Sequence, residues 1–212
     1  MVTTTEEWPA TAATSVNGTS SRNAQLPHSW SLDGKTLIFE EFNPETAQDL
    51  YVLSMEGERS LKPLIQTEFT EDRPAVSPDG RWIVYRSNES GRFEVSVRPF
   101  PNVEDGKSKI STEGGISPAW GPQGRKVFYH SLDEGAMMVV RIETEPNFVA
   151  GTPDLLFTGR YYRGAGRNYD VSLNGQRFLM LKEVEQTEER QNQLVTITNF
   201  FEELKRAVPA ER

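Results

Sequence analysis

The sequence predicts an all-β fold made of four similar units. A short motif recurs along the 212 residues as "WSLDGKTLIF" (30–39), "VSPDGRWIVY" (76–85), "WGPQGRKVFY" (120–129) and "VSLNGQRFLM" (171–180). Its glycines are Gly34, Gly80, Gly124 and Gly175, so the repeats are spaced by 46, 44 and 51 residues. Each motif ends in an apolar run without a polar face, which is typical of a strand covered on both sides. Such repeats of short strands predict a β-propeller with one blade per repeat.

The first element of each repeat is a tight turn. The turn residues are Asp33 and Gly34, Asp79 and Gly80, Gln123 and Gly124, and Asn174 and Gly175. Aspartate and asparagine can accept hydrogen bonds from neighbouring amides, and glycine adopts the positive φ that closes a short hairpin. Gln123 fits this pattern least well. We expect Gly80→Val to destabilise the fold, because a β-branched residue is poorly tolerated at positive φ.

An apolar segment that ends at Trp30, Val76, Trp120 or Val171 precedes each turn as a first strand, and further strands follow the turn. The second strands are "TLIF", "WIVY", "KVFY" and "RFLM", and the third strands are "DLYVL" (49–53), "FEVSV" (93–97), "MMVVRI" (137–142) and "QLVTI" (193–197). The first three repeats add a weaker fourth strand, "LKPLI", "KSKI" or "DLLF". The predicted blades span about 24–69, 70–113, 114–163 and 164–198. A β-sandwich is the alternative, but it does not explain the regular spacing.

The two ends of the chain differ from the repeats. Residues 1–23 are rich in Ser and Thr and poor in apolar side chains, which predicts a mobile segment. Residues 199–212 contain "NFFEELKRAVP", which predicts a short C-terminal helix capped by Asn199 and stopped by Pro209, followed by a tail.

Four blades are the lower limit for this architecture. The fourth repeat also lacks a fourth strand, so we expect an incomplete or open propeller that leaves apolar blade faces uncovered. Self-association through these open faces is one consequence. A small closed ring and a dimer that completes a ring are the alternatives.

Composition excludes several function classes. With 31 acidic and 23 basic residues the net charge is −8, which argues against nucleic-acid binding. Cysteine is absent, which removes disulfides and thiolate chemistry. We find no targeting signal and no apolar run of the ~18 residues that a membrane span requires, so no membrane insertion is expected.

Catalytic and metal-binding motifs are also missing. The sequence has no phosphate-binding glycine loop, no kinase catalytic loop and no Gly-x-Ser-x-Gly elbow; Ser117 in "GISPAW" lacks the second glycine. His28 and His130 are about a hundred residues apart and are interpreted as loop or strand-end residues. The acidic loops show no calcium-loop spacing. We therefore predict no catalytic residue, no metal site and no cofactor.

One loop is a candidate binding site. Connections between blades and between second and third strands share one end of a propeller, opposite the glycine turns. The longest blade-to-blade connection is 158–169, "TGRYYRGAGRNY", and it concentrates arginine and tyrosine, which are common in protein-binding hot spots. The candidate residues are Arg160, Tyr161, Tyr162, Arg163, Arg167 and Tyr169. Internal pairing of the arginines with acidic loops, and packing of the tyrosines between blades, is the alternative.

The repeats resemble the WD-like repeats of TolB-type propellers. From "LPHSWSLDGK" through "YRSNESGRFEVSVRPFP", "GRNYDVSLNGQRFLM" and "NFFEELKR", the chain is similar to the C-terminal propeller region of bacterial receptor-like serine/threonine protein kinases. This resemblance implies a non-catalytic module for protein interaction or ligand sensing, outside the cytoplasm, with an unknown protein or small-ligand partner. The alternative is the propeller of a prolyl-oligopeptidase-like serine peptidase, which is also non-catalytic.

Overall fold

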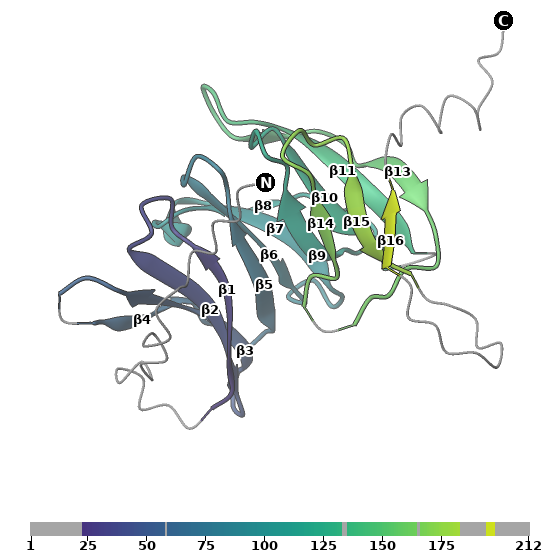
Figure 1. The fold of residues 1–212 in the computed structure, drawn as a ribbon. Helices are drawn as coiled ribbons and strands as arrows, with labels where there is room; N and C mark the ends of the chain where they lie inside the picture. The colour runs from purple at the N-terminus through teal and green to yellow at the C-terminus, as the bar shows by residue number, and fades with distance from the viewer. Residues whose placement is uncertain (1–22, 58, 133–134, 165, 183–193, 198–212) are drawn as a thin grey trace, which may run out of the picture.

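The structure is a computed structural model that describes residues 23–57, 59–132, 135–164, 166–182 and 194–197. The predicted N-terminal mobile segment (apart from residue 23) and the predicted C-terminal helix lie outside these residues. The described chain is all-β, apart from a single 3-10 turn at Val103–Asp105, and forms four antiparallel sheets. Figure 1 shows the sheets following one another from the purple β1–β4 to the yellow β16.

The first two sheets each contain four strands in chain order. The first sheet consists of β1 (Gln25–Trp30), β2 (Thr36–Asn43), β3 (Ala47–Ser54) and β4 (Leu61–Ile65). The second sheet consists of β5 (Glu71–Val76), β6 (Trp82–Ser87), β7 (Glu94–Pro99) and β8 (Ser108–Lys109). This up-and-down order within each sheet is that of a propeller blade.

The third and fourth sheets depart slightly from this plan. The third sheet consists of β9 (Ile116–Trp120), β10 (Lys126–His130) and β11 (Ala136–Glu143), with β12 (Val149–Ala150) and β13 (Asp154–Thr158) both pairing with β11. The fourth sheet consists of β14 (Tyr169–Val171), β15 (Phe178–Leu181) and β16 (Leu194–Ile197). The structure thus confirms the predicted β-propeller fold.

The core lies between the faces of consecutive sheets. Ile38 and Leu50 of the first sheet pack with Ile83 and Tyr85 of the second. The next cluster joins the second and third sheets through side chains that include Val84, Val97, Trp120, Val127 and Tyr129. A third cluster joins the third and fourth sheets through Phe128, Met137, Phe157, Phe178 and Met180. A middle sheet is therefore apolar on both faces, which explains "WIVY".

The glycine turns gather at one end of the sheets. Gly34, Gly80, Gly124 and Gly175 all have φ between +68° and +73°. In the second sheet the Gly80 amide donates to Ser77 O at 2.9 Å, and Asp79 Oδ1 accepts from the Arg81 amide at 3.1 Å. Asp33 and Asn174 accept the equivalent bonds. Gln123 instead donates from Nε2 to Leu173 O of the next turn, at 3.4 Å.

Candidate functional site

At the end of the sheets opposite the glycine turns, two residues have strained backbone conformations. In β5 the pairing with β6 shifts register between Asp72 and Ala75, and β9 shows a shift at the equivalent place. Arg73 and Ser117 occupy these irregular positions with φ of 52° and 53°. Positive φ costs a non-glycine residue roughly 1–3 kcal/mol and persists only where the surroundings enforce it. Arg73 Nη1 donates a hydrogen bond to Ser117 Oγ, so the two irregular strands are joined through their side chains.

Charged groups from the first two sheets surround Arg73. Glu40 Oε2 accepts from the Arg73 amide at 3.1 Å and lies 2.9 Å from His28 Nε2. Burial opposes ionisation of Glu40, but the contacts with His28 and Arg73 outweigh it and lower its pKa. Asp72 is buried and pairs with Arg86, whose Nε donates to Asp72 Oδ1 at 2.6 Å. Both carboxylates therefore already have cationic or amide partners.

Contacts of Arg73 and Ser117 continue to the fourth sheet. Arg73 Nη2 donates to Gly164 O at 3.1 Å, and Ser117 Oγ lies 3.4 Å from Gly166 O. The Tyr169 hydroxyl lies 2.9 Å from Ser117 O and 3.0 Å from Phe128 O. We call Glu40, Asp72, Arg73, Arg86 and Ser117 the central polar network. It links the first three sheets, where β1 adjoins β5 and β5 adjoins β9, and Tyr169 at the start of β14 contacts it from the fourth sheet.

His130 lies beside this network without a hydrogen bond. The side chain is 1% exposed, and neither ring nitrogen has a hydrogen-bond partner within the described part of the chain. Its ring meets Tyr169 edge-on at 5.2 Å between centroids and lies 6.5 Å from Tyr161. Burial, and then the charges of Arg163 and Arg73, lower the pKa of His130 to about 4. The imidazole is therefore neutral near pH 7.

The predicted binding loop 158–169 covers this region and is held through its backbone. The Tyr162 amide donates to Leu181 O at 2.8 Å, and Tyr161 forms an isolated bridge with Lys182. Arg163 Nη1 lies 3.2 Å from Ser131 O and 3.0 Å from Leu132 O. The loop is thus attached to both the third and the fourth sheet.

The six candidate residues of this loop have different surroundings. Tyr169 is 5% exposed and belongs to the core, where burial raises its pKa; Tyr161 is half-buried. Arg160, Tyr162, Arg163 and Arg167 are exposed, with 47% of Tyr162 accessible to solvent. Arg167 Nη2 lies 3.7 Å from Asp170 Oδ1. The structure therefore leaves four of the six side chains exposed and places Tyr169 between sheets.

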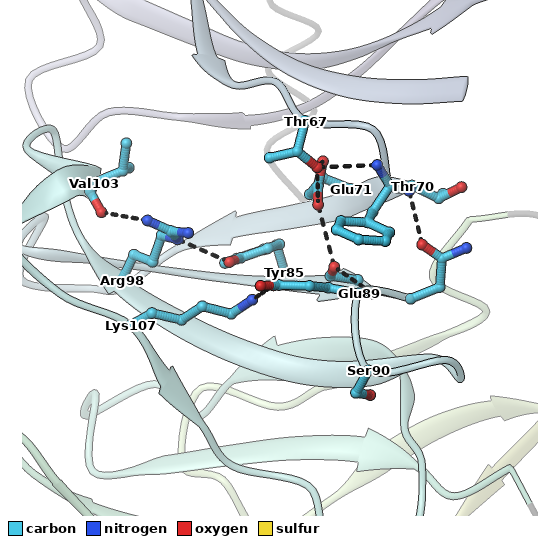
Figure 2. A network of polar contacts seen from close by, with 12 residues as sticks. Thr67, Thr70, Glu71, Tyr85, Glu89, Ser90, Arg98, Val103 and Lys107 are labelled. Atoms are coloured by element: carbon cyan, nitrogen blue, oxygen red, sulfur yellow. Dashed lines mark hydrogen bonds and ion pairs between the residues drawn. The ribbon is translucent and has the colours of Figure 1, made fainter. Parts of the chain in front are cut away.

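A second polar cluster lies where the first sheet joins the second. Figure 2 shows Thr67 beside Glu71; the Thr67 hydroxyl lies 3.0 Å from both carboxylate oxygens, and Ser87 Oγ lies 3.2 Å from Oε1. Burial raises the pKa of Glu71 despite these contacts. Lys107 pairs with Glu89 nearby. These contacts tie the 66–70 connection to β6 and require no ligand.

Two further buried carboxylates also connect a sheet to the segment that leaves it. Asp49 lies near the start of β3 and Glu94 is the first residue of β7, and the two hold equivalent positions because they pair with Glu41 and Ser87 of the neighbouring second strands. Asp49 Oδ2 accepts from Gln66 Nε2 at 3.0 Å, and Glu94 Oε2 accepts from Ser111 Oγ and, at 3.0 Å, from the Gly114 amide. Each donor lies in the connection that leaves its sheet. We interpret both carboxylates as structural.

Metal and membrane sites have little support in the described residues. Within them, no group of three or more His, Asp or Glu side chains is placed to hold a metal ion. No helix long and apolar enough to span a bilayer occurs in the same part of the chain.

The central polar network was not predicted from the sequence. Its members come from strand starts and strand ends that are far apart along the chain, and only the stacking of sheets brings them together. Aligning the repeats gives one indication of this network. Arg73 and Ser117 precede Gly80 and Gly124 by the same seven residues, so they had to occupy equivalent positions.

Comparisons with known proteins agree with the fold. No known family profile matches the sequence. An uncharacterized protein of Agrobacterium fabrum is 28% identical over 106 residues, which cover 50% of this chain and 36% of the relative. The structure assigned as TolB in Agrobacterium tumefaciens has a TM-score of 0.52 at 22% identity, covering 66% of this chain and 51% of its own. TolB of Acinetobacter baumannii has a TM-score of 0.59 at 16% identity, covering 80% and 40%.

These similarities show a TolB-like β-propeller fold. The chain spans between about a third and a half of the relatives it matches. The same fold occurs in an oligogalacturonate lyase in complex with manganese, with a TM-score of 0.54 at 9% identity over 76% of this chain and 47% of that one. The fold alone therefore does not decide between binding and catalysis.

Proposed function

We propose that this chain is a non-catalytic propeller module that binds a protein or a small ligand through the end carrying residues 158–169. The observation that carries the proposal is that the described part of this loop is anchored to the sheets around it. Its backbone is held by Leu181 O, Lys182 and Arg73, while the side chains of Arg160, Tyr162 and Arg167 stay exposed. A rigid loop loses little entropy on binding, so exposed Tyr and Arg on it are efficient anchors.

The charge distribution supports a specific partner. The chain has a net charge of −8, yet three exposed arginines share this one loop. Opposite charge would draw an acidic partner to this loop, while the rest of the acidic surface would repel it. Such a partner would therefore bind in one orientation.

The experiment is a pull-down from the source organism with a loop variant in which Arg160, Tyr162 and Arg167 are changed to Ala. We expect the variant to lose a partner that the parent retains, with a melting midpoint close to that of the parent. Arg163 is left unchanged because it holds the carbonyl groups of Ser131 and Leu132. A variant with Arg125→Ala and Arg177→Ala removes the same charge from exposed positions next to the glycine turns and serves as the control.

Equal recovery of the partner by the loop variant and the parent contradicts the proposed site. A loss that also occurs in the control would show a general charge effect rather than a binding loop. A partner lost only with the loop variant supports the proposal.

We further propose that the module belongs to a receptor-like serine/threonine kinase and lies outside the cytoplasm. The resemblance over residues 24–208 supports this context. The alternative context is a prolyl-oligopeptidase-like peptidase. Sequencing the gene region decides between them, because an upstream kinase domain with a membrane span fits the first, and a downstream domain with a Gly-x-Ser-x-Gly motif fits the second.

A further inference from the structure

Arg73 has unused hydrogen-bonding capacity at the centre of the proposed binding end. A guanidinium carries five N–H donors. The described residues accept two bonds from it, one at Ser117 Oγ and one at Gly164 O. No carboxylate of the described residues lies within ion-pair distance of it, although the chain contains 31 acidic residues. The side chain is partly exposed, so a ligand can reach it.

The positive charge of Arg73 is incompletely compensated. Burial, and then the neighbouring Arg86, lower the pKa of the Arg73 guanidinium. Asp72 and Glu40 partly offset this effect, but each also has another partner: Glu40 contacts His28 as well as the Arg73 amide, and Asp72 pairs with Arg86. Both Arg73 and Arg163 lie close enough to the buried His130 to act on its ionisation. An arrangement of this kind favours the arrival of an anion.

His130 is an independent sign of a missing partner. A buried polar group without a hydrogen bond costs about 1–3 kcal/mol, so native structures seldom retain one without a reason. Among the described residues, neither ring nitrogen of His130 has a hydrogen-bond partner at 1% exposure, and both Arg73 and Arg163 are near enough to affect its ionisation. Its equivalents in the first and second sheets, Glu40 and Arg86, are both paired.

We propose that Arg73 binds a single carboxylate at the central end of the propeller, with Ser117 and Gly164 holding the guanidinium in place. A carboxylate accepts two parallel N–H bonds from a guanidinium, which matches the donors left over. Glu40, whose pKa is lowered by its contacts, lies nearby and disfavours a phosphate dianion, so a monoanion fits better. This inference rests on the proposed function and names the chemical group that the binding end recognises.

The strained backbone is consistent with this role. Arg73 and Ser117 are held at positive φ by the irregular pairing of β5 and β9, and their side chains contact each other. Strain of this kind aims a side chain that regular pairing would direct elsewhere. The site would therefore be lost if the irregularity were removed, even with Arg73 retained.

The test is an NMR titration of the isotope-labelled 212-residue chain with sodium acetate, with sodium chloride as the ionic-strength control. We expect acetate to shift the Arg73 side-chain Nε–H signal and the amide signals of Ser117 and Gly166, and chloride to leave them unchanged. Phosphate should bind at least threefold more weakly than acetate. Shifts confined to the glycine-turn end, or equal shifts with chloride, would overturn the proposal without any variant.

Variants then assign the site to Arg73. Arg73→Gln should weaken acetate binding at least tenfold, and Arg73→Lys should give an intermediate affinity because it keeps the charge but loses the planar fork. Arg81→Gln, a change at an exposed arginine of the second glycine turn, removes the same charge and should bind acetate as the parent does. Unchanged affinity in Arg73→Gln would contradict the assignment.

The source of the carboxylate is decided by a second arm with a blocked peptide that contains one aspartate. Binding of both acetate and the peptide indicates a carboxylate on a protein partner, and binding of acetate alone indicates a small acid. Both results support a carboxylate site. If the loop variant with Arg160, Tyr162 and Arg167 changed to Ala loses its partner while Arg73→Gln does not, the proposed function stands and this inference fails.

Discussion

At the scale of single residues, three of the four turn glycines, all except Gly34, lie close to side chains of the preceding turn. A Cβ added to Gly80 would lie 3.0 Å from Cβ of Leu32 in the preceding turn. At Gly124 the nearest atom would be Cδ of Pro78, and at Gly175 a Cδ atom of Pro122, each at 3.7 Å. The residue two positions before each of the first three turn glycines, which is Leu32, Pro78 or Pro122, therefore packs against the turn glycine of the next sheet. The turns form a contact series as well as closing hairpins.

Replacing Gly80 by Val should lower the free energy of unfolding by about 1–3 kcal/mol, because positive φ is strained for a β-branched residue. The close approach of Leu32 adds to this cost. Chemical denaturation measures the change. Gly151→Ala is the control, since Gly151 has no positive φ and its nearest neighbour, Arg141 O, would lie 3.5 Å from the new Cβ. A Gly80→Val variant as stable as the parent would contradict the assigned turn.

At the scale of the elements, neighbouring sheets are joined by a few polar bonds within an apolar interface. Trp120 in β9 donates from Nε1 to Ala75 O in β5 at 3.0 Å. Trp82 in β6 packs against Phe148 at 4.6 Å between ring centroids, and its buried Nε1 finds no hydrogen-bond partner among the residues that the structure describes. The two tryptophans thus differ in whether the indole N–H donates a hydrogen bond.

Trp120→Phe should therefore destabilise the chain by about 1 kcal/mol more than Trp82→Phe, because it removes a hydrogen bond between sheets in addition to apolar area. Trp82→Phe loses similar area but also removes an unsatisfied donor. Denaturant titration of both variants measures the difference. A larger loss in Trp82→Phe would show that packing, rather than the bond to Ala75 O, controls the joint between the second and third sheets.

At the scale of the whole molecule, the outer faces of the first and the fourth sheet are not covered by another described sheet. Leu179 and Leu181 alternate with the buried Phe178 and Met180 in β15, and they are 39% and 40% exposed. Alternation places them on the face of the fourth sheet that points away from the third. Trp30, which is 50% exposed, lies on the first strand of the first sheet.

We propose that the 212-residue chain self-associates through such faces. Changing Leu179 and Leu181 together to Ser should shift the sedimentation coefficient toward the monomer, because burial of the two leucines would no longer favour association. Leu155→Ser is the control, since Leu155 is 60% exposed but lies in β13 at the edge of the third sheet. Concentration-independent monomers of the parent chain would contradict self-association.

The repeats determined the fold class. Regular spacing of the glycine turns and apolar runs such as "WIVY" was sufficient, because a strand without a polar face must lie between two layers. The interval of 51 residues also marked 158–169 as the longest connection between sheets. Short weak strands were less predictable: β8 falls within the predicted "KSKI", whereas β12 was not predicted.

Only the tertiary structure decided the composition of the candidate site. The loop 158–169 was visible as a run of Arg and Tyr, yet Tyr169 turned out to be a core residue because β14 begins there. Arg73 looked like an ordinary charged residue before a strand. Its contacts with Ser117 and Gly164 join positions 44 and 91 residues away. Local sequence sets turns and strands, whereas such contacts depend on how the sheets stack.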